Sequence, residues 1–315
     1  MCGLHRGFPW LPQGPPAATS YAARARRTPA GPRATLIITV TSPSDHLKTS
    51  PAQWRSRLGT VAFKVCSAVM VTAFGVACFR PSPAPYTPRD PALAGFPLFF
   101  YPSATPSVPA KAFVFFVGND IGFWGAHQDL AKRLAGAGYH VVGFDTKQFF
   151  SRLPADTAAR ARMFADSVAV MIGLARRELR ADSIPVVLGG HSLGAEVAGW
   201  IAVHAPPPRL AGLLLISSRG RGHLQATLSD IANRTAPSEP GSYSVADNIA
   251  ALPAGVRVAL VRGTDDRFRA VDAELLRAGA GRIDKWSVPW GGHSMSNIML
   301  AGPFIERAVA WTLDR

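Results

Sequence analysis

The chain has 315 residues and a formal net charge of +14, and that charge is unevenly distributed. Residues 1–90 hold 11 Lys and Arg against 2 Asp and Glu, whereas residues 91–315 hold 23 against 18. The basic excess therefore belongs mostly to the N-terminal part, and we expect no nucleic-acid-binding face on the folded part, where basic side chains are balanced by acids. The three cysteines, Cys2, Cys66 and Cys78, all precede that part, which excludes a disulfide framework and a cysteine-based metal site within it.

The N-terminal part reads as two segments with different roles. Residues 1–54 are rich in Pro, Ala, Arg, Ser and Thr without periodicity, which predicts a disordered extension. Residues 55–78 begin with basic side chains and continue into the apolar run Val65–Ala77. Those 13 residues are fewer than a membrane-spanning helix needs, which favours a secretory signal peptide. An uncleaved membrane anchor is the alternative, and a signal here also predicts a translation start downstream of Met1.

The end of this segment is similar to a bacterial lipoprotein signal. Small residues Gly75 and Ala77 precede Cys78, which would then be the lipidated first residue of the mature protein. Such a signal directs a protein to the periplasm or to the outer face of the inner membrane. We therefore expect membrane association through the N-terminal segment.

A proline-rich linker is predicted over residues 79–95, followed by alternating strands and helices over residues 96–315. Short apolar runs predict strands at 96–101, 112–117, 139–144, 185–189, 210–217, 256–262 and 283–288. Several of them are uninterrupted, as expected for strands buried on both faces. Amphipathic stretches predict helices at 127–136, 156–180, 194–204, 270–279 and 299–313. This alternation indicates an α/β fold with a mostly parallel sheet flanked by helices.

One pentapeptide lies where a strand gives way to a helix. Gly190-His191-Ser192-Leu193-Gly194 directly follows a predicted strand, and a helix begins after it. On such a tight turn, known as a nucleophile elbow, the serine hydroxyl is lifted clear of the sheet and the glycines relieve crowding. The backbone N–H of Leu193 then faces a developing oxyanion at the positive end of the helix. We interpret Ser192 as a nucleophile.

A serine nucleophile needs a base that is held by an acid, and the chain order in this kind of fold is serine, acid, histidine. His293 lies in a glycine-bearing loop just past the last predicted strand, whereas His223 precedes every candidate acid. His293 is therefore the predicted base. The loop after strand 256–262 supplies the acid, for which Asp266 is favoured and Asp265 is the alternative.

The loop after the strand at 112–117 is expected to complete the oxyanion hole. A backbone N–H of Asn119 or Asp120 is the natural second donor, although the Asp120 side chain could simply cap the following helix. Trp124 and Glu196 are possible substrate-binding residues; for Glu196 the helix dipole alone would favour an acid at that position. No metal site, phosphate loop or dinucleotide fingerprint is present, so no cofactor is expected.

Several segments together resemble the VirJ/AcvB-type bacterial virulence proteins, a branch of the α/β-hydrolase superfamily. They are Val117–Trp124, Gly143–Ser151, the elbow Gly190–Val197 and Gly291-Gly292-His293. The resemblance covers the chain from about Ala112 onward. It implies the α/β-hydrolase fold, a periplasmic or membrane-attached location, and hydrolysis of aminoacylated phospholipid such as lysyl-phosphatidylglycerol.

The leading interpretation is therefore an extracytoplasmic serine hydrolase that cleaves an ester, with residues 218–251 forming a short lid in place of a regular helix. A membrane phospholipid is the expected class of partner. The alternative from another class is a non-catalytic envelope scaffold on the same fold. Nucleic-acid binding through residues 1–60 is a third option, which requires that those residues persist in the mature protein.

Overall fold

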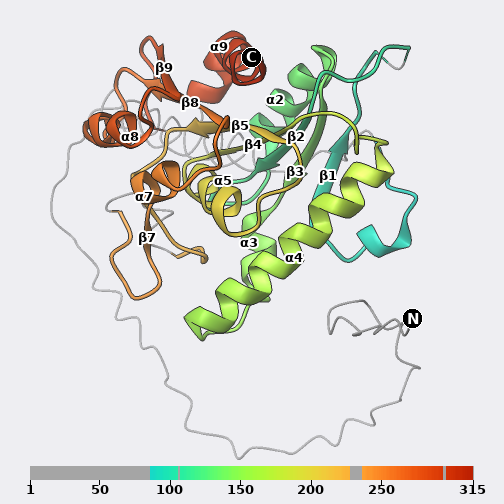
Figure 1. Cartoon of the computed structure of the whole chain (residues 1–315), viewed down its shortest axis with the longest axis horizontal. Coiled ribbons are helices and arrows are strands. Elements are labelled where there is room, and N and C mark those ends of the chain that lie inside the picture. Colours follow the sequence, from blue (N-terminus) through green and yellow to red (C-terminus); the bar gives the residue numbers. More distant parts are fainter. Residues whose placement is uncertain (1–85, 106, 228–235, 294–295, 315) are drawn as a thin grey trace, which may run out of the picture. The chain divides into compact units, whose positions relative to one another are not determined.

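A seven-stranded sheet forms the centre of the fold, with helices on both faces (Figure 1). The computed structural model describes residues 86–105, 107–227, 236–293 and 296–314. The strand order is β1-β3-β2-β4-β5-β8-β9, and only β1 runs antiparallel to its neighbour. The strands are β1 (Leu98–Tyr101), β2 (Phe113–Val117), β3 (His140–Phe144), β4 (Val186–His191), β5 (Leu210–Ile216), β8 (Arg257–Gly263) and β9 (Ile283–Val288). The predicted α/β fold with a mostly parallel sheet is confirmed.

Each predicted helix is present, and the described chain adds short elements that the periodicity did not predict. The helices are α2 (Gly125–Gly136), α3 (Thr146–Phe150), α4 (Thr157–Glu178), α5 (Leu193–His204), α7 (Val245–Ala250), α8 (Asp272–Ala278) and α9 (Ser296–Leu313). Two single-turn 3-10 helices are η1 (Pro91–Leu93) and η2 (Arg269–Val271), and β6 (Arg221–Gly222) pairs with β7 (Tyr243–Ser244). The helix α4 begins where Asp156 accepts a hydrogen bond of 2.7 Å from the N–H of Ala159, which satisfies one of the unpaired groups of a helix start.

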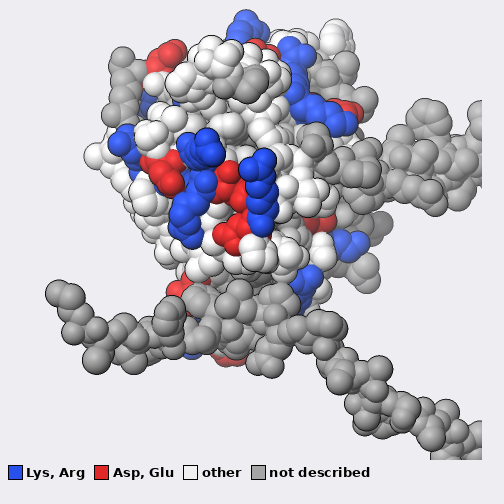
Figure 2. Space-filling view, turned by 90° about the vertical axis from the view of Figure 1, so that its right-hand side faces the viewer, with Lys and Arg blue, Asp and Glu red and all other residues white. Residues whose placement is uncertain are grey.

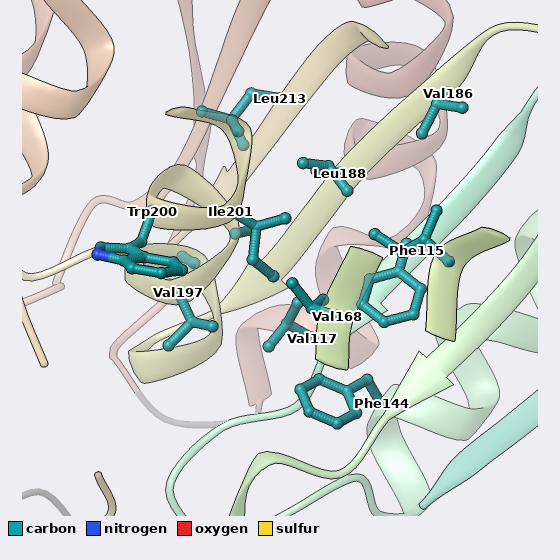
Figure 3. Close-up of a cluster of buried hydrophobic side chains, with 14 of the residues drawn as sticks. Phe115, Val117, Phe144, Val168, Val186, Leu188, Val197, Trp200, Ile201 and Leu213 are labelled. Atoms are coloured by element: carbon teal, nitrogen blue, oxygen red, sulfur yellow. The ribbon is translucent and has the colours of Figure 1, made fainter. Parts of the chain in front are cut away.

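The sheet is buried on both faces because its side chains alternate between two apolar clusters. Phe115 and Val117 of β2 belong to the cluster under α4, α5, α7 and α8, while Val114 and Phe116 belong to the one under α2 and α9. Figure 3 shows part of the first cluster, including Ile201 of α5. Burying each such side chain stabilises the fold by about 1.5–3 kcal/mol. This two-sided burial explains why several strands read as uninterrupted apolar runs. The edge strand β9 is only partly buried.

The segment predicted to be a linker is partly packed against the domain. Tyr86 forms a bridge with Phe100 of β1, its hydroxyl donates a hydrogen bond to Glu178, and Leu93 in η1 is buried. The linker prediction is therefore wrong for residues 86–95. The predicted extension (residues 1–54), the signal segment (55–78) and residues 79–85 lie outside the described residues.

The described part of the predicted lid, residues 218–251, is partly regular. It contains the β6–β7 pair and α7, which packs against α5 and α8. The expectation that this segment replaces a regular helix is thus wrong at α7, whose side chains Val245 and Ile249 enter the core. A short helix with few apolar positions gives too little periodicity to be recognised from sequence.

The surface seen in Figure 2 carries charges of both signs on one face, with Lys and Arg side chains interspersed among Asp and Glu. Among the residues that the structure describes, no helix combines the length and the apolar character needed to cross a bilayer.

Candidate active site

Ser192 lies in a tight turn between β4 and α5, with φ of 53° and ψ of −123°. These angles are unfavourable for a residue that carries a Cβ. The flanking glycines permit the turn: a Cβ on Gly190 would lie 2.2 Å from the carbonyl oxygen of Gly194, and one on Gly194 would lie 2.2 Å from that of Val117. The pentapeptide therefore adopts the predicted elbow, with the serine at the start of α5.

The three residues predicted as nucleophile, base and acid lie in one hydrogen-bonded row. The Ser192 hydroxyl oxygen is 3.0 Å from Nε2 of His293. The other ring nitrogen, Nδ1, is 3.2 Å from Oδ1 and 3.3 Å from Oδ2 of Asp266. All three residues are buried, at 1%, 5% and 1% exposure, respectively. A histidine between a hydroxyl and a carboxylate can take the hydroxyl proton while the carboxylate stabilises the resulting imidazolium.

Close backbone contact brings the histidine loop onto the acid loop. Gly263 ends β8, and a Cβ there would lie 2.1 Å from the carbonyl oxygen of Gly291. That oxygen accepts a hydrogen bond of 2.8 Å from the N–H of Asp265. The ring of Phe268 packs edge-on against His293 at 4.9 Å between centroids. The glycine thus allows the loops after two adjacent parallel strands to meet.

Of the two candidate acids, the structure brings only Asp266 into hydrogen-bonding distance of His293. Asp265 has an exposed side chain. Oδ1 of Asp266 accepts a hydrogen bond of 2.9 Å from the N–H of Phe268, and Oδ2 accepts one of 2.8 Å from Arg262. Burial by itself raises the pKa of Asp266, but the hydrogen bond with His293 and the positive charge of Arg262 outweigh it and hold that pKa below its ordinary value. The carboxylate is therefore ionised at neutral pH.

The other histidines have different surroundings. His223, which the chain order excluded as the base, pairs through Nδ1 with Glu239. His191 and His127 lie in a buried row behind His293, with ring centroids 6.2 Å apart for His191 and His293 and 5.6 Å apart for His127 and His191. Burial, reinforced by the charge of His293, lowers the pKa of His191 to about 3, and burial lowers the pKa of His127 well below its ordinary value. Both rings are neutral near pH 7.

The predicted oxyanion-hole residues lie around the elbow. Leu193 is the first residue of α5, and the N–H groups of a helix start have no partner within the helix. Gly194 sits so close to the backbone of Val117 and Gly118 that the loop after β2 must border the elbow. Asn119 and Asp120 follow in that loop and are buried. The backbone oxygen of Asn119 is held by Thr146 at 2.8 Å.

The two residues predicted as possible substrate contacts have partners inside the protein. Both carboxylate oxygens of Glu196 face Arg219, at 2.9 and 2.8 Å, and neither side chain is exposed. The carboxylate of Glu196 is therefore used within the fold, and the substrate-binding prediction for it is wrong. Trp124 is the N-cap residue of α2, is 9% exposed, and donates from its indole to Oδ1 of Asn119 at 3.4 Å.

Sequence reasoning missed the ion pairs that support this row. Arg262 contacts Asp266, and its guanidinium also reaches Asp272 on α8. A charged residue at the end of an otherwise apolar buried strand was the available signal, because a buried charge requires a partner. Among the described residues, no cluster of His, Cys, Asp and Glu side chains could hold a metal ion.

Comparison with known proteins places the chain in a family. Residues 111–299, more than half of the chain, match the family described as bacterial virulence protein (VirJ). The chain belongs to the VirJ family. The resemblance inferred from the elbow and its surrounding segments is thereby confirmed. No curated protein matches the sequence.

Solved structures resemble this VirJ family member at low sequence identity. Protein TT1662 from Thermus thermophilus is 18% identical with a TM-score of 0.49, covering 70% of this chain and 95% of its own. The esterase domain of a Rhodothermus marinus protein is 15% identical with a TM-score of 0.47 (69% and 97% covered). An S-formylglutathione hydrolase from Agrobacterium tumefaciens is 14% identical, also with a TM-score of 0.47 (69% and 89%). Similarity of this size says nothing of activity.

Proposed function

We propose that the protein is a serine hydrolase that cleaves a carboxylic ester through Ser192, His293 and Asp266. The observation that carries this proposal is the hydrogen-bonded row, with 3.0 Å from the Ser192 hydroxyl to Nε2 of His293 and the Asp266 carboxylate on the opposite ring nitrogen. The serine also lies on a strained turn at a helix start, where its hydroxyl is presented to a bound carbonyl.

The reaction follows from these positions. The Ser192 oxygen attacks the ester carbonyl carbon while its proton passes to Nε2 of His293, and the backbone N–H of Leu193, with one from Asn119 or Asp120, holds the oxyanion. Collapse of this intermediate breaks the ester bond, and the leaving alcohol takes the proton from the histidine. Water then attacks the acyl-enzyme by the same proton route, which releases the acid and restores the serine.

The substrate class we propose is an aminoacylated phospholipid, such as lysyl-phosphatidylglycerol, at the outer face of the inner membrane. Support comes from the family resemblance and from the pattern of residues 55–78, whose basic start and apolar run suit a signal peptide or lipoprotein signal ending at Cys78. That location would place the site in the periplasm and beside lipid esters.

Labelling of the full chain with a fluorophosphonate probe tests the proposal, because the probe reacts only with an activated serine. We expect labelling of the wild type and none of Ser192→Ala or His293→Ala. Ser217→Ala is the matched control, since Ser217 is also buried and has a similar left-handed φ of 54° at the end of the adjacent strand. It should label like the wild type. A folded wild-type protein that does not label would favour a non-catalytic scaffold.

The substrate is tested separately by release of lysine from lysyl-phosphatidylglycerol vesicles, compared with hydrolysis of a small soluble ester. If the protein hydrolyses only the small ester, the proposed serine hydrolase activity is supported and the proposed phospholipid substrate is rejected.

A further inference from the structure

A chain of alternating charges leads from the proposed triad acid to the protein surface. Arg262, at the end of β8, donates hydrogen bonds to Asp266 at 2.8 Å and, through Nε, to Oδ1 of Asp272 at 2.9 Å. Its Nη2 also lies 2.8 Å from that Oδ1 in an ion pair. Lys285 on β9 continues the chain, with its ammonium 2.9 Å from Oδ2 of Asp272. The members come from four different places in the fold: β8, the loop after it, α8 and β9.

The chain is buried except at its outer end. The side chains of Arg262, Asp266 and Asp272 are 1%, 0% and 4% exposed, whereas that of Lys285 is 35% exposed. Arg262 is also fixed by a hydrogen bond of 2.6 Å to the carbonyl oxygen of Ser218. Burying a guanidinium is costly unless it is fully paired. Orientation of Asp266 does not by itself require that cost, because the N–H of Phe268 already holds Oδ1.

We propose that Arg262 is a positioning residue that sets the pH range in which His293 accepts the serine proton, and that Asp272 and Lys285 tune its effect. This inference rests on the proposed function. The imidazolium formed during the reaction is stabilised by the negative charge of Asp266, and the positive charge of Arg262 offsets part of that stabilisation. Because Arg262 and Asp272 are buried, solvent screens their effect on the ring only weakly, whereas it screens the partly exposed Lys285 more strongly.

Other charged and titratable groups around the ring are not members of this chain. His191, from β4, is kept neutral by burial, and Glu196 of α5 is neutralised by Arg219. The side chains of 265, 267 and 269 on the acid loop are exposed, where solvent screens them, and Asp120 lies on the loop after β2. None of these groups changes in the variants below.

The test uses charge changes whose expected effects have opposite signs. Asp272→Asn removes a negative charge, which makes protonation of His293 less favourable. The pH below which the labelling rate falls (the acid limb of the profile) should therefore decrease by on the order of one pH unit. Arg262→Gln and Lys285→Met each remove a positive charge and should move the limb to higher pH, less for Lys285 because it is partly exposed. Arg262→Lys keeps the positive charge, so its acid limb should lie closer to that of the wild type than the limb of Arg262→Gln does.

Fluorophosphonate labelling rates of the full chain between pH 4.5 and 9 provide the profile, and the imidazole ¹⁵N shifts of His293 give the same titration without any chemistry. The control is Glu306→Gln, because Glu306 forms an exposed ion pair with Arg133 at 3.3 Å. It should change neither the labelling profile nor the imidazole titration. The inference would be overturned if Asp272→Asn and Lys285→Met moved the acid limb of the profile in the same direction, or did not move it. This comparison remains available even if Arg262→Gln fails to fold. If Ser192 is not labelled but the imidazole shifts of His293 change in the variants as expected, the serine hydrolase is rejected while the charge effect on His293 stands.

Discussion

Removing one partner of the buried Glu196–Arg219 pair should cost a large part of the protein's stability. The backbone N–H, Nε and Nη2 of Arg219 donate to the two carboxylate oxygens of Glu196 at 2.9, 2.9 and 2.8 Å, and neither side chain has any exposure. Glu196→Gln keeps the shape but removes the negative charge that the Nε and Nη2 of the buried guanidinium contact. Breaking a pair of this kind typically costs about 3–5 kcal/mol, out of a total of about 5–15 kcal/mol for a domain.

Urea unfolding of the full chain at pH 7, followed by circular dichroism, measures this loss as a change in the free energy of unfolding. The matched control is Glu306→Gln, which breaks a pair whose two side chains are 46% and 38% exposed. Solvent already screens that pair, so its loss should cost no more than about 1 kcal/mol.

A double variant separates the cost of removing one charge of the pair from the value of the pair itself. Replacing Glu196 and Arg219 together by Met removes both charges and keeps most of the apolar volume, so it should recover most of the stability lost by Glu196→Gln. A loss below about 1 kcal/mol for Glu196→Gln would refute the reasoning, because it would mean that the charge of Glu196 contributes little to holding Arg219 in the core.

Two further predictions concern the elbow and the buried histidines. Gly190→Ala should lower the free energy of unfolding in urea by about 1–3 kcal/mol and abolish labelling of Ser192, because its Cβ would lie 2.2 Å from a backbone oxygen. Gly199→Ala in α5 is the control, since no atom lies within 4 Å of its Cβ, and it should raise the free energy of unfolding by about 0.5–1 kcal/mol. Burial lowers the pKa of His127 and of His191, so below about pH 6.5 both rings become protonated in the unfolded chain but stay neutral in the folded protein. The contribution of these rings to the free energy of unfolding is therefore complete above that pH. It decreases by about 1.4 kcal/mol for each ring with every unit by which the pH falls below it. His191→Asn should reduce the slope by one ring's share, and an unchanged slope would contradict this account.

The sheet and the row of Ser192, His293 and Asp266 follow from local patterns. Most strands of the main sheet are apolar runs of suitable length, although β9 contains Asp284 and Lys285 and is only partly buried. The order serine, acid, histidine then selects residues at the ends of β4, β8 and β9. Once the strands are parallel and neighbouring, their carboxyl ends meet at one edge, and the residues that follow must lie close together. The sequence favoured Asp266 by its spacing from Gly263 and left Asp265 open, whereas in the structure Asp266 is the one whose carboxylate lies within hydrogen-bonding distance of His293.

The ion pairs around this row depend on contacts that no local pattern encodes. Glu196 at a helix start is favoured by the dipole alone, so its sequence position gave no sign of Arg219, which lies 23 residues further along. Arg262, at the end of an apolar strand, signals that a partner is needed, but its position does not identify Asp272, which begins α8. Periodicity predicts which side chains are buried, whereas the pairing of buried charges depends on the crossing of separate elements.

The placement of the 118–120 loop shows how one steric requirement can set the geometry of the candidate site. Gly194 is needed because α5 begins against the backbone of β2 and its following loop, with the Val117 and Gly118 carbonyl oxygens 2.2 and 2.4 Å from a hypothetical Cβ. Since β2 is hydrogen-bonded directly to β4, that loop is held beside the elbow by the sheet itself. The backbone of the 118–120 loop is therefore near Ser192 whatever its side chains are. Substitutions at Asn119 or Asp120 should accordingly alter side-chain contacts of the loop while leaving backbone donors in place.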